Sequence, residues 1–163
     1  MAPHWQKRKA TIDRVSTLCG FALEGAAVFI AWVNRLGPGE PPSLARVIAS
    51  MAIGPFGGAL AWFAVKHLGR QWRITAGVWE DHSLVQRGPY SLVRHPVYAS
   101  LLLLLLSTLL LLTPWMWVAI SLALFIIGTE IRIRGEERLL AERFGAEFEN
   151  YRRQVRAYIP FVR

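Results

Sequence analysis

Two stretches of this 163-residue chain carry the side chains that could do chemistry. Near the carboxyl end, Arg132 and Glu136 lie four positions apart, so on a helix they would share one face. They suit either a surface ion pair worth about 0.2–0.5 kcal/mol or two separate ligand contacts. A carboxylate accepts strong hydrogen bonds, and a guanidinium orients an acidic group. In the middle of the chain, Tyr90 and Tyr98 offer aromatic faces, which attract cations but also suit anchors at a membrane interface.

A histidine and a second carboxylate accompany these residues. His95 precedes Pro96, and proline suits the first turn of a helix. His95 is therefore either a hydrogen-bonding residue at a helix start or a ligand-binding residue. Gly88-Pro89-Tyr90 predicts a turn shortly before it. Glu137 either joins the site or is a solvated carboxylate that pairs with the tail, and the sequence leaves both open.

The composition excludes several classes of protein. With 53% hydrophobic residues, the chain is too apolar for an ordinary soluble domain or a disordered segment, although its formal net charge is +8. The sequence has one cysteine, Cys19, which rules out an intramolecular disulfide and a cysteine zinc cluster. It has no G-x-G-x-x-G motif after a strand pattern, so a nucleotide-binding domain of the soluble type is not predicted.

Intervals that lack charge predict helices that cross a membrane. The 20 residues between Arg14 and Arg35 contain one charge, Glu24. The 19 residues between Arg46 and Lys66 contain none. Each interval suits one spanning helix, because such a helix needs about 20 apolar residues.

A third interval without charge is too long for one such helix. It covers the 35 residues 95–129, and Thr113-Pro114 lies near its middle. Since proline ends one helix and suits the start of the next, we expect a hairpin of two helices. The sequence therefore predicts an all-α, polytopic membrane protein with about four transmembrane helices.

The basic residues predict how these helices are oriented. Four precede the first predicted span, two lie between the first and second, five between the second and third, and eight from Arg132 onward. Because Lys and Arg accumulate in cytoplasmic segments, both termini and the middle segment are expected in the cytoplasm, at the inner membrane if the host is bacterial. The first 14 residues resemble the start of a signal peptide, but no clean cleavage site follows, so we expect a retained anchor.

Three further patterns concern packing. Glu24 is costly in hydrocarbon, so it should face the other helices or a wet cavity, as a packing residue or as a proton or cation site. Gly54, Gly57 and Gly58 offer a small-xxx-small pattern from Gly54 to Gly58, which lets helices approach closely. In the tail, apolar residues recur at steps of three or four, which predicts an amphipathic helix that folds back on the membrane or the core. These residues are Leu140, Phe144, Phe148, Tyr151, Val155 and Tyr158.

Taken in order, several short motifs resemble a known family. It comprises the integral-membrane methyltransferases typified by isoprenylcysteine carboxyl methyltransferase and, more distantly, the phospholipid N-methyltransferases. Together the motifs cover about half the chain, whereas the first two predicted spans carry no family signature. The motifs are His82-Ser83-Leu84-Val85, Gly88-Pro89-Tyr90, Arg94-His95-Pro96-Val97-Tyr98, then an apolar hairpin, Arg132, Glu136-Glu137, Phe144-Gly145, Tyr151 and Pro160.

The resemblance implies that S-adenosylmethionine binds without a Rossmann fold, between the middle loop, the inner ends of the hairpin and the tail. It implies one domain, 1–163, with two spans in 1–66 and the cofactor-binding loop, hairpin and tail in 67–163. It assigns Arg132 as the catalytic, substrate-binding arginine, and no metal is required. Thr75 falls where the family has a glutamine, which Gln71 could replace only if the loop shifts. The implied cofactor residues are His82, Ser83, Leu84, Val85, Tyr90, His95, Pro96, Val97, Tyr98 and Glu136.

The activity that this resemblance implies is methyl transfer to a lipophilic or membrane-partitioned small substrate. The acceptor could be a carboxylate, an amine or a thiol, and the sequence does not choose among them. Membrane lipids are the other expected partners. A nucleic-acid partner is not expected, because membrane topology and anionic headgroups account for the positive charge.

Two other interpretations are open. Membrane sterol reductases share a related carboxyl-terminal layout with an Arg-His-Pro-x-Tyr block and use a nicotinamide cofactor, but their cores are much larger. Small proton-coupled multidrug transporters have four helices with one acidic residue in the first, where this chain has Glu24. Those transporters have short loops and tails, whereas this chain has long polar segments after its second and fourth predicted spans.

Overall fold

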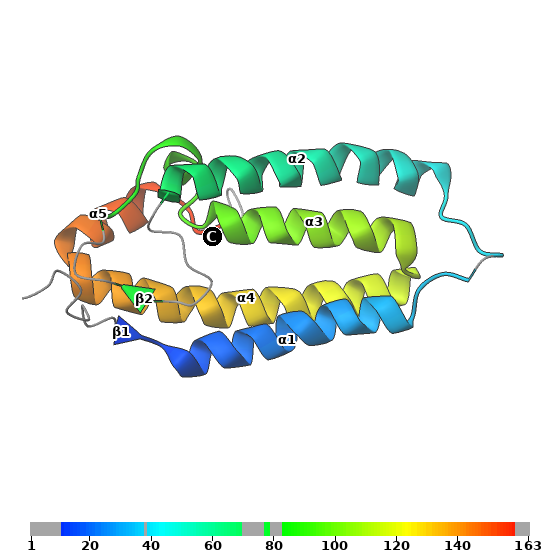
Figure 1. The fold of residues 1–163 in the computed structure, drawn as a ribbon, viewed down its shortest axis with the longest axis horizontal. Helices are drawn as coiled ribbons and strands as arrows, with labels where there is room; N and C mark the ends of the chain where they lie inside the picture. The colour runs from blue at the N-terminus through cyan, green and yellow to red at the C-terminus, as the bar shows by residue number, and fades with distance from the viewer. Residues whose placement is uncertain (1–10, 38, 70–76, 79–82, 159–163) are drawn as a thin grey trace, which may run out of the picture.

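Four long helices form the body of the computed structural model, which describes residues 11–37, 39–69, 77–78 and 83–158. They are α1 (Arg14–Val33), α2 (Leu44–Leu68), α3 (Pro96–Leu112) and α4 (Trp115–Phe144). Successive helices run in opposite directions and lie side by side in the order α2, α3, α4, α1 (Figure 1). The most extensive contacts are those of α1 with α4 and of α2 with α3. The predicted all-α class is confirmed.

Short elements gather at one end of these helices. The 3-10 turn η2 (Gly88–Ser91) precedes α3, and α5 (Ala146–Gln154) follows α4. Two two-residue strands, β1 (Thr11–Ile12) and β2 (Gly77–Val78), pair in antiparallel register. Elements β1, β2 and α5 all lie at the left end in Figure 1, which is therefore the end where the polar segments meet.

The hairpin between α3 and α4 turns at the predicted place. Thr113 is the C-cap of α3, and Pro114 is the N-cap of α4. Arg46 of α2 closes the turn from the side, since its Nε donates to the carbonyl oxygen of Leu110 at 2.7 Å. It also donates to the carbonyls of Leu109 and Thr113. The end of a helix leaves carbonyls without helical partners, and Arg46 supplies donors there. The carbonyl of Leu109 accepts in addition from the backbone N–H of Thr113.

Three of the four helices, α1, α2 and α4, are long and apolar enough to cross a membrane. Helix α3 is apolar but has 17 residues, which is shorter than these three. The chain is thus polytopic, whereas the count of four spans stays a prediction. The cytoplasmic location of the termini also stays a prediction, and the resemblance to a signal peptide concerns residues that lie mostly outside the described chain.

Glycines allow α1 and α4 to approach closely. A Cβ at Gly20 would lie 2.2 Å from Cγ of Arg132 and 2.8 Å from the backbone oxygen of Gly128. A Cβ at Gly135 would lie 2.8 Å from a carboxylate oxygen of Asp13. Real side chains cannot make such contacts, so each position requires glycine for the observed packing. These three glycines were not predicted from the sequence as contact positions.

The predicted glycine contact in α2 is partly wrong. Gly54 faces Ser107 of α3, and Gly57 faces Leu103 and Leu104, but a Cβ at Gly58 would meet nothing within 4 Å. The face that packs on α3 therefore runs from Gly54 to Gly57. These two lie three positions apart, and a helix places such residues on one face as readily as residues four apart.

The predicted helix of the tail is interrupted. Helix α4 continues without a break to Phe144, and Gly145 then takes a positive φ of 51°, a conformation that glycine adopts without strain. Helix α5 ends at Gln154, so Val155 and Tyr158 lie outside it. The predicted folding back is confirmed, because α5 buries its aromatic residues Phe148 and Tyr151.

The contact between α1 and α4 yields a first prediction. Gly20→Ala should lower the free energy of unfolding by about 1–3 kcal/mol, because the added methyl overlaps Arg132 and the backbone of Gly128. Gly25→Ala is the matched control on the same helix, where a Cβ meets nothing within 4 Å. It should raise stability by about 0.5–1 kcal/mol through helix propensity. Thermal unfolding in detergent measures both, and equal effects would contradict the close contact.

Candidate active site

A cavity of about 320 Å³ lies at the end of the helices where the polar segments meet. This volume is in the range of small-molecule sites. The residues that line it come from α1, α2, the segment before α3, α3, α4 and α5. They are Phe21, Ala61, Val65, Leu68, Ser83, Leu84, Val85, Tyr90, Arg94, His95, Val97, Tyr98, Ser100, Leu101, Arg132, Glu136, Leu140, Phe148 and Tyr151.

Most residues expected in the site from the sequence lie around this cavity. Pro96 does not line it, since it is fully buried at the first turn of α3. His82 lies outside the described residues, as do Thr75, Gln71 and Pro160. The structure brings together Ser83, Leu84, Val85, Tyr90, His95, Val97, Tyr98, Arg132 and Glu136.

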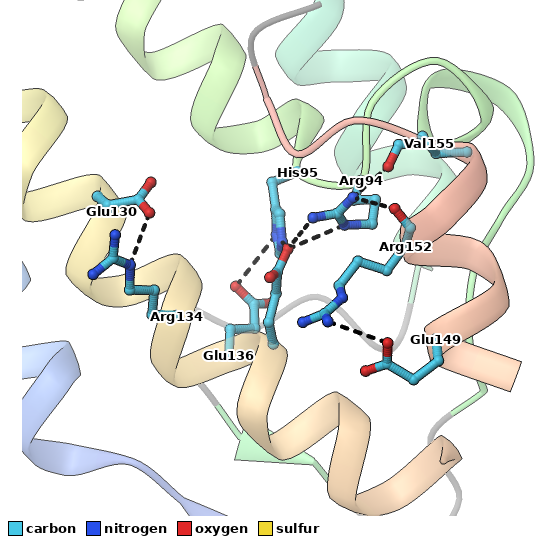
Figure 2. Close-up of polar contacts among 9 residues, drawn as sticks. Arg94, His95, Glu130, Arg134, Glu136, Glu149, Arg152 and Val155 are labelled. Atoms are coloured by element: carbon cyan, nitrogen blue, oxygen red, sulfur yellow. Dashed lines mark hydrogen bonds and ion pairs between the residues drawn. The ribbon is translucent and has the colours of Figure 1, made fainter. Parts of the chain in front are cut away.

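A buried ion pair lies behind the polar wall of the cavity, which is formed by His95, Glu136 and other motif residues. Glu137 of α4 accepts hydrogen bonds from Nε and Nη2 of Arg94, at 3.1 and 2.5 Å. The two side chains are only 6% and 8% exposed. The structure excludes the solvated role left open for Glu137, and it places this carboxylate beside Arg94 and His95 and not among the residues that line the cavity. Figure 2 shows Arg94 directed toward the backbone of Arg152 and Val155.

His95 lies between two carboxylates of α4. Its Nε2 is 3.3 Å from Oε1 of Glu137, and its Nδ1 is 3.7 Å from Oε2 of Glu136 (Figure 2). The ring also meets Tyr98 edge-on, with centroids 5.8 Å apart. Glu136 is the more accessible carboxylate, with a side chain 34% exposed, and it lines the cavity. His95 is thus both the N-cap of α3 and a residue of the cavity wall.

The carboxyl-terminal segment closes this end of the cavity through backbone contacts. The backbone N–H groups of Arg94 and His95 donate to the carbonyls of Arg156 and Ala157, both at 2.7 Å. Nη1 of Arg94 donates to the carbonyls of Arg152 and Val155. The hydroxyl of Tyr151 donates to the carbonyl of Tyr90 at 2.5 Å. These hydrogen bonds therefore hold the tail against the start of α3.

The two tyrosines that line this wall outside the long helices, Tyr90 and Tyr151, keep their protons. Burial raises the pKa of both hydroxyls well above the usual value of a tyrosine. The negative charge of Glu136 adds to the rise for Tyr90. Both are therefore neutral hydrogen-bonding groups with aromatic faces, and not phenolates, near neutral pH.

Arg132 pairs with a residue of the first helix. Its Nη1 donates to Oε2 of Glu24 at 2.7 Å, and the hydroxyl of Thr129 donates to the other carboxylate oxygen at 3.1 Å. The guanidinium carbon lies 4.0 Å from the ring centre of Phe21 and 4.9 Å from that of Tyr98. The expectation that Glu24 faces the other helices is confirmed. Arg132 thus forms an ion pair with α1, while Glu136 has His95 as a neighbour.

Several lining residues were not found from the sequence. Four of them belong to apolar runs in which any apolar side chain suits the membrane, so nothing in the sequence distinguishes them. These four are Phe21, Ala61, Val65 and Leu68. Phe148 and Tyr151 did carry a signal, the period of the tail. Arg94 was part of a quoted motif, but its role became visible only with Glu137 as its partner.

The buried pair yields the prediction for this site. Glu137→Gln should lower the free energy of unfolding by about 3–5 kcal/mol, because it leaves the buried Arg94 without a counter-charge. Glu149→Gln is the control, since the side chains of Glu149 and its partner Arg152 are 38% and 49% exposed. This surface pair should contribute no more than about 1 kcal/mol. Detergent-solubilised variants compared by thermal unfolding test the difference, and a mild effect at Glu137 would refute the pair's structural role.

The chain is similar to known proteins through its second half and part of α2. Residues 50–142 match the model of the isoprenylcysteine carboxyl methyltransferase (ICMT) family. A probable protein-S-isoprenylcysteine O-methyltransferase of Oryza sativa subsp. indica is 36% identical over 84 residues, which cover 51% of this chain and 44% of that protein. The protein-S-isoprenylcysteine O-methyltransferase of Saccharomyces cerevisiae is 41% identical over 83 residues, which cover 50% and 34%.

The matched part covers less than half the length of each of these relatives. Within this chain, however, the family match extends over more than half of the 163 residues. It contains the start of α3 with Arg94 and His95, and also Arg132, Glu136 and Glu137 of α4. Because the match includes the residues that build the polar wall of the cavity, the chain belongs to the isoprenylcysteine carboxyl methyltransferase family.

Proposed function

We propose that this chain is an integral-membrane methyltransferase that uses S-adenosylmethionine to methylate a lipophilic acceptor. The observation that carries this proposal is the cavity, whose walls differ in chemistry. Its lining includes polar motif residues such as Tyr90, His95 and Glu136, which we call the polar wall, and apolar side chains of the long helices such as Ala61 and Leu101, which we call the apolar wall. Such a lining offers contacts both to polar and to apolar parts of ligands.

The polar wall suits the cofactor by the chemistry of its groups. Glu136 offers an accessible carboxylate that can accept hydrogen bonds from ribose hydroxyls or from the amino-acid ammonium. Tyr90 and Tyr98 offer aromatic faces, which attract a sulfonium and can stack on adenine. Ser83, Leu84 and Val85 also line the cavity. When bound, S-adenosylmethionine supplies an electrophilic methyl group, which passes to the acceptor's lone pair as the carbon–sulfur bond breaks and its electrons return to sulfur.

The apolar wall suits an acceptor with a hydrocarbon chain. The curated relatives are named for isoprenylcysteine, a carboxylate that carries such a chain. We extend this acceptor class to the present chain as part of the proposal, with lipophilic amines and thiols as the other members to test. Arg132 would orient an acidic group of the acceptor, because its guanidinium is fixed at the cavity wall.

The protein's own contribution to the reaction is positioning and exclusion of water. No protein nucleophile is needed, because the acceptor provides the attacking lone pair. Holding both ligands in line converts a bimolecular encounter into a step within one complex. An anionic acceptor also loses its solvation in an apolar cavity, and fixed groups such as Arg132 take the place of that water.

The activity is tested by labelled methyl transfer. Purified protein in detergent is incubated with methyl-labelled S-adenosylmethionine and four probes: N-acetyl-S-farnesylcysteine, dodecanoic acid, dodecylamine and dodecanethiol. We expect label in at least one lipophilic product, identified by mass spectrometry, and above all in the methyl ester of the farnesylcysteine. A protein that binds S-adenosylmethionine but labels only the amine or the thiol would change the acceptor class. A protein that neither binds it nor labels any probe would refute the function.

The role of Glu136 yields a separate prediction. Glu136→Gln keeps the shape of the side chain but removes its charge, so the affinity for S-adenosylmethionine should fall by about 1.5–3 kcal/mol, or roughly ten- to 150-fold in Kd. Glu149→Gln, which removes an exposed carboxylate of α5 outside the cavity, should leave the Kd unchanged. Calorimetry on the solubilised variants measures both. Unchanged affinity in the Glu136 variant would make this residue a helix-surface carboxylate.

A further inference from the structure

We infer that Glu24, on the first helix and outside the part of the chain that matches the family, positions the Arg132 guanidinium for the acceptor. The inference rests on the proposed function and deepens it. It makes Glu24 a positioning residue, since it acts through Arg132 and does not itself line the cavity. It also gives α1 a part in the reaction beyond that of a membrane anchor.

The first step is the geometry of the pair. Both side chains are buried, with 8% and 9% of their surface exposed, and the N···O distance is 2.7 Å. Each carboxylate oxygen of Glu24 has its own donor, one from Arg132 and one from Thr129. The carboxylate therefore cannot rotate freely, and it fixes one edge of the guanidinium.

The second step is the shape of the contact between α1 and α4. A Cβ at Gly20 would lie 2.2 Å from Cγ and 2.6 Å from Cδ of Arg132, so the stem of this arginine lies directly against the bare backbone of Gly20. Glu24 follows Gly20 by one helical turn on the same face and meets the guanidinium at the end of that stem. The side chain of Arg132 therefore lies along α1, with its stem against Gly20 and its guanidinium against Glu24.

The third step concerns the faces of the guanidinium. The ring centre of Phe21, also on α1, is 4.0 Å from the guanidinium carbon, and that of Tyr98 is 4.9 Å away. Phe21, Tyr98 and Arg132 all line the cavity. These aromatic contacts and the ion pair with Glu24 therefore contribute to the orientation of the planar group, and this planarity is the property that lets arginine bind a carboxylate by two parallel hydrogen bonds.

The fourth step is the depth of Arg132 in the cavity. It precedes Glu136 by about one turn of α4, on the side toward the membrane-spanning part of the helix. Glu136 lies beside His95 at the polar end, whereas Arg132 lies between Phe21 and Tyr98. With the cofactor at Glu136, the acceptor is the ligand nearer to Arg132. A loss of Glu24 should therefore affect the acceptor and leave the cofactor largely unaffected.

The test compares acceptor kinetics with cofactor affinity in Glu24→Gln, Glu24→Asp and Arg132→Lys. The acceptor is N-acetyl-S-farnesylcysteine, or whichever of the four probes the wild type methylates. We expect Glu24→Gln to raise the acceptor KM by at least about tenfold, because the guanidinium loses its charged partner, with the Kd for S-adenosylmethionine within about twofold of the wild type. Glu24→Asp keeps the charge on a shorter side chain. Its acceptor KM should therefore lie between that of the wild type and that of Glu24→Gln.

A double variant and a control separate positioning from packing. If Glu24 acts through Arg132, adding Glu24→Gln to Arg132→Lys should raise the acceptor KM by far less than Glu24→Gln does alone. Ser50→Ala is the control, since Ser50 and Ser107 form a buried polar contact between α2 and α3 outside the cavity. It should lower the melting temperature but leave both ligand constants unchanged.

The outcomes distinguish the positioning role of Glu24 from the proposed methyltransferase function. An unchanged acceptor KM in a folded, active Glu24→Gln variant, or an equal loss of cofactor affinity, overturns the positioning role and leaves the proposed function standing. A wild type that neither binds S-adenosylmethionine nor methylates any probe overturns both. If Glu24→Gln does not fold, Glu24→Asp decides: a raised KM at unchanged cofactor Kd supports the role, and an unchanged KM overturns it.

Discussion

The buried pair of Arg94 and Glu137 is the interaction on which the rest of the site depends. Two charges that are almost fully removed from water must stay together, because either one alone would be strongly unfavourable in such surroundings. Arg94 uses its remaining hydrogen-bonding capacity on backbone carbonyls of the carboxyl-terminal segment. One guanidinium therefore joins the start of α3, the end of α4 and the tail, which are distant in the sequence but must meet for a cavity to exist.

Helix α4 is bound on two sides through its charged residues. Glu137 reaches toward α3, and Arg132 reaches toward α1. The two ion pairs differ in origin, since Arg94 and Glu137 both lie in the part matched by the family, whereas Glu24 lies outside it. The shared part of the chain thus forms the polar wall, and the part without a family signature completes the surroundings of Arg132.

The sequence predicted the elements of the fold better than their contacts. Charge-free intervals and Thr113-Pro114 located the four long helices, because burial in lipid and the geometry of proline are local constraints. The tail was predicted as one helix, because its apolar period continues past Gly145 although the backbone does not. Most site residues came from motifs of the family. Two ion pairs could not be predicted, because no local sequence pattern indicates a contact between residues so far apart in the chain. The residues are 108 positions apart in the pair of Arg132 with Glu24 and 43 positions apart in the pair of Glu137 with Arg94.

The length of α4 determines which of its residues lie at the boundary between the hydrocarbon core and water. Its 30 residues measure about 45 Å, whereas the hydrocarbon core of a bilayer is about 30 Å thick. Counted from Trp115 at one boundary, Arg132 lies about 26 Å along the helix and Glu136 about 32 Å, so the opposite boundary falls between them. Across one helical turn, the surroundings change from low to high dielectric constant. The positions of Arg132 and Glu136 relative to such a boundary are therefore fixed by the number of residues in a continuous helix and do not depend on a loop.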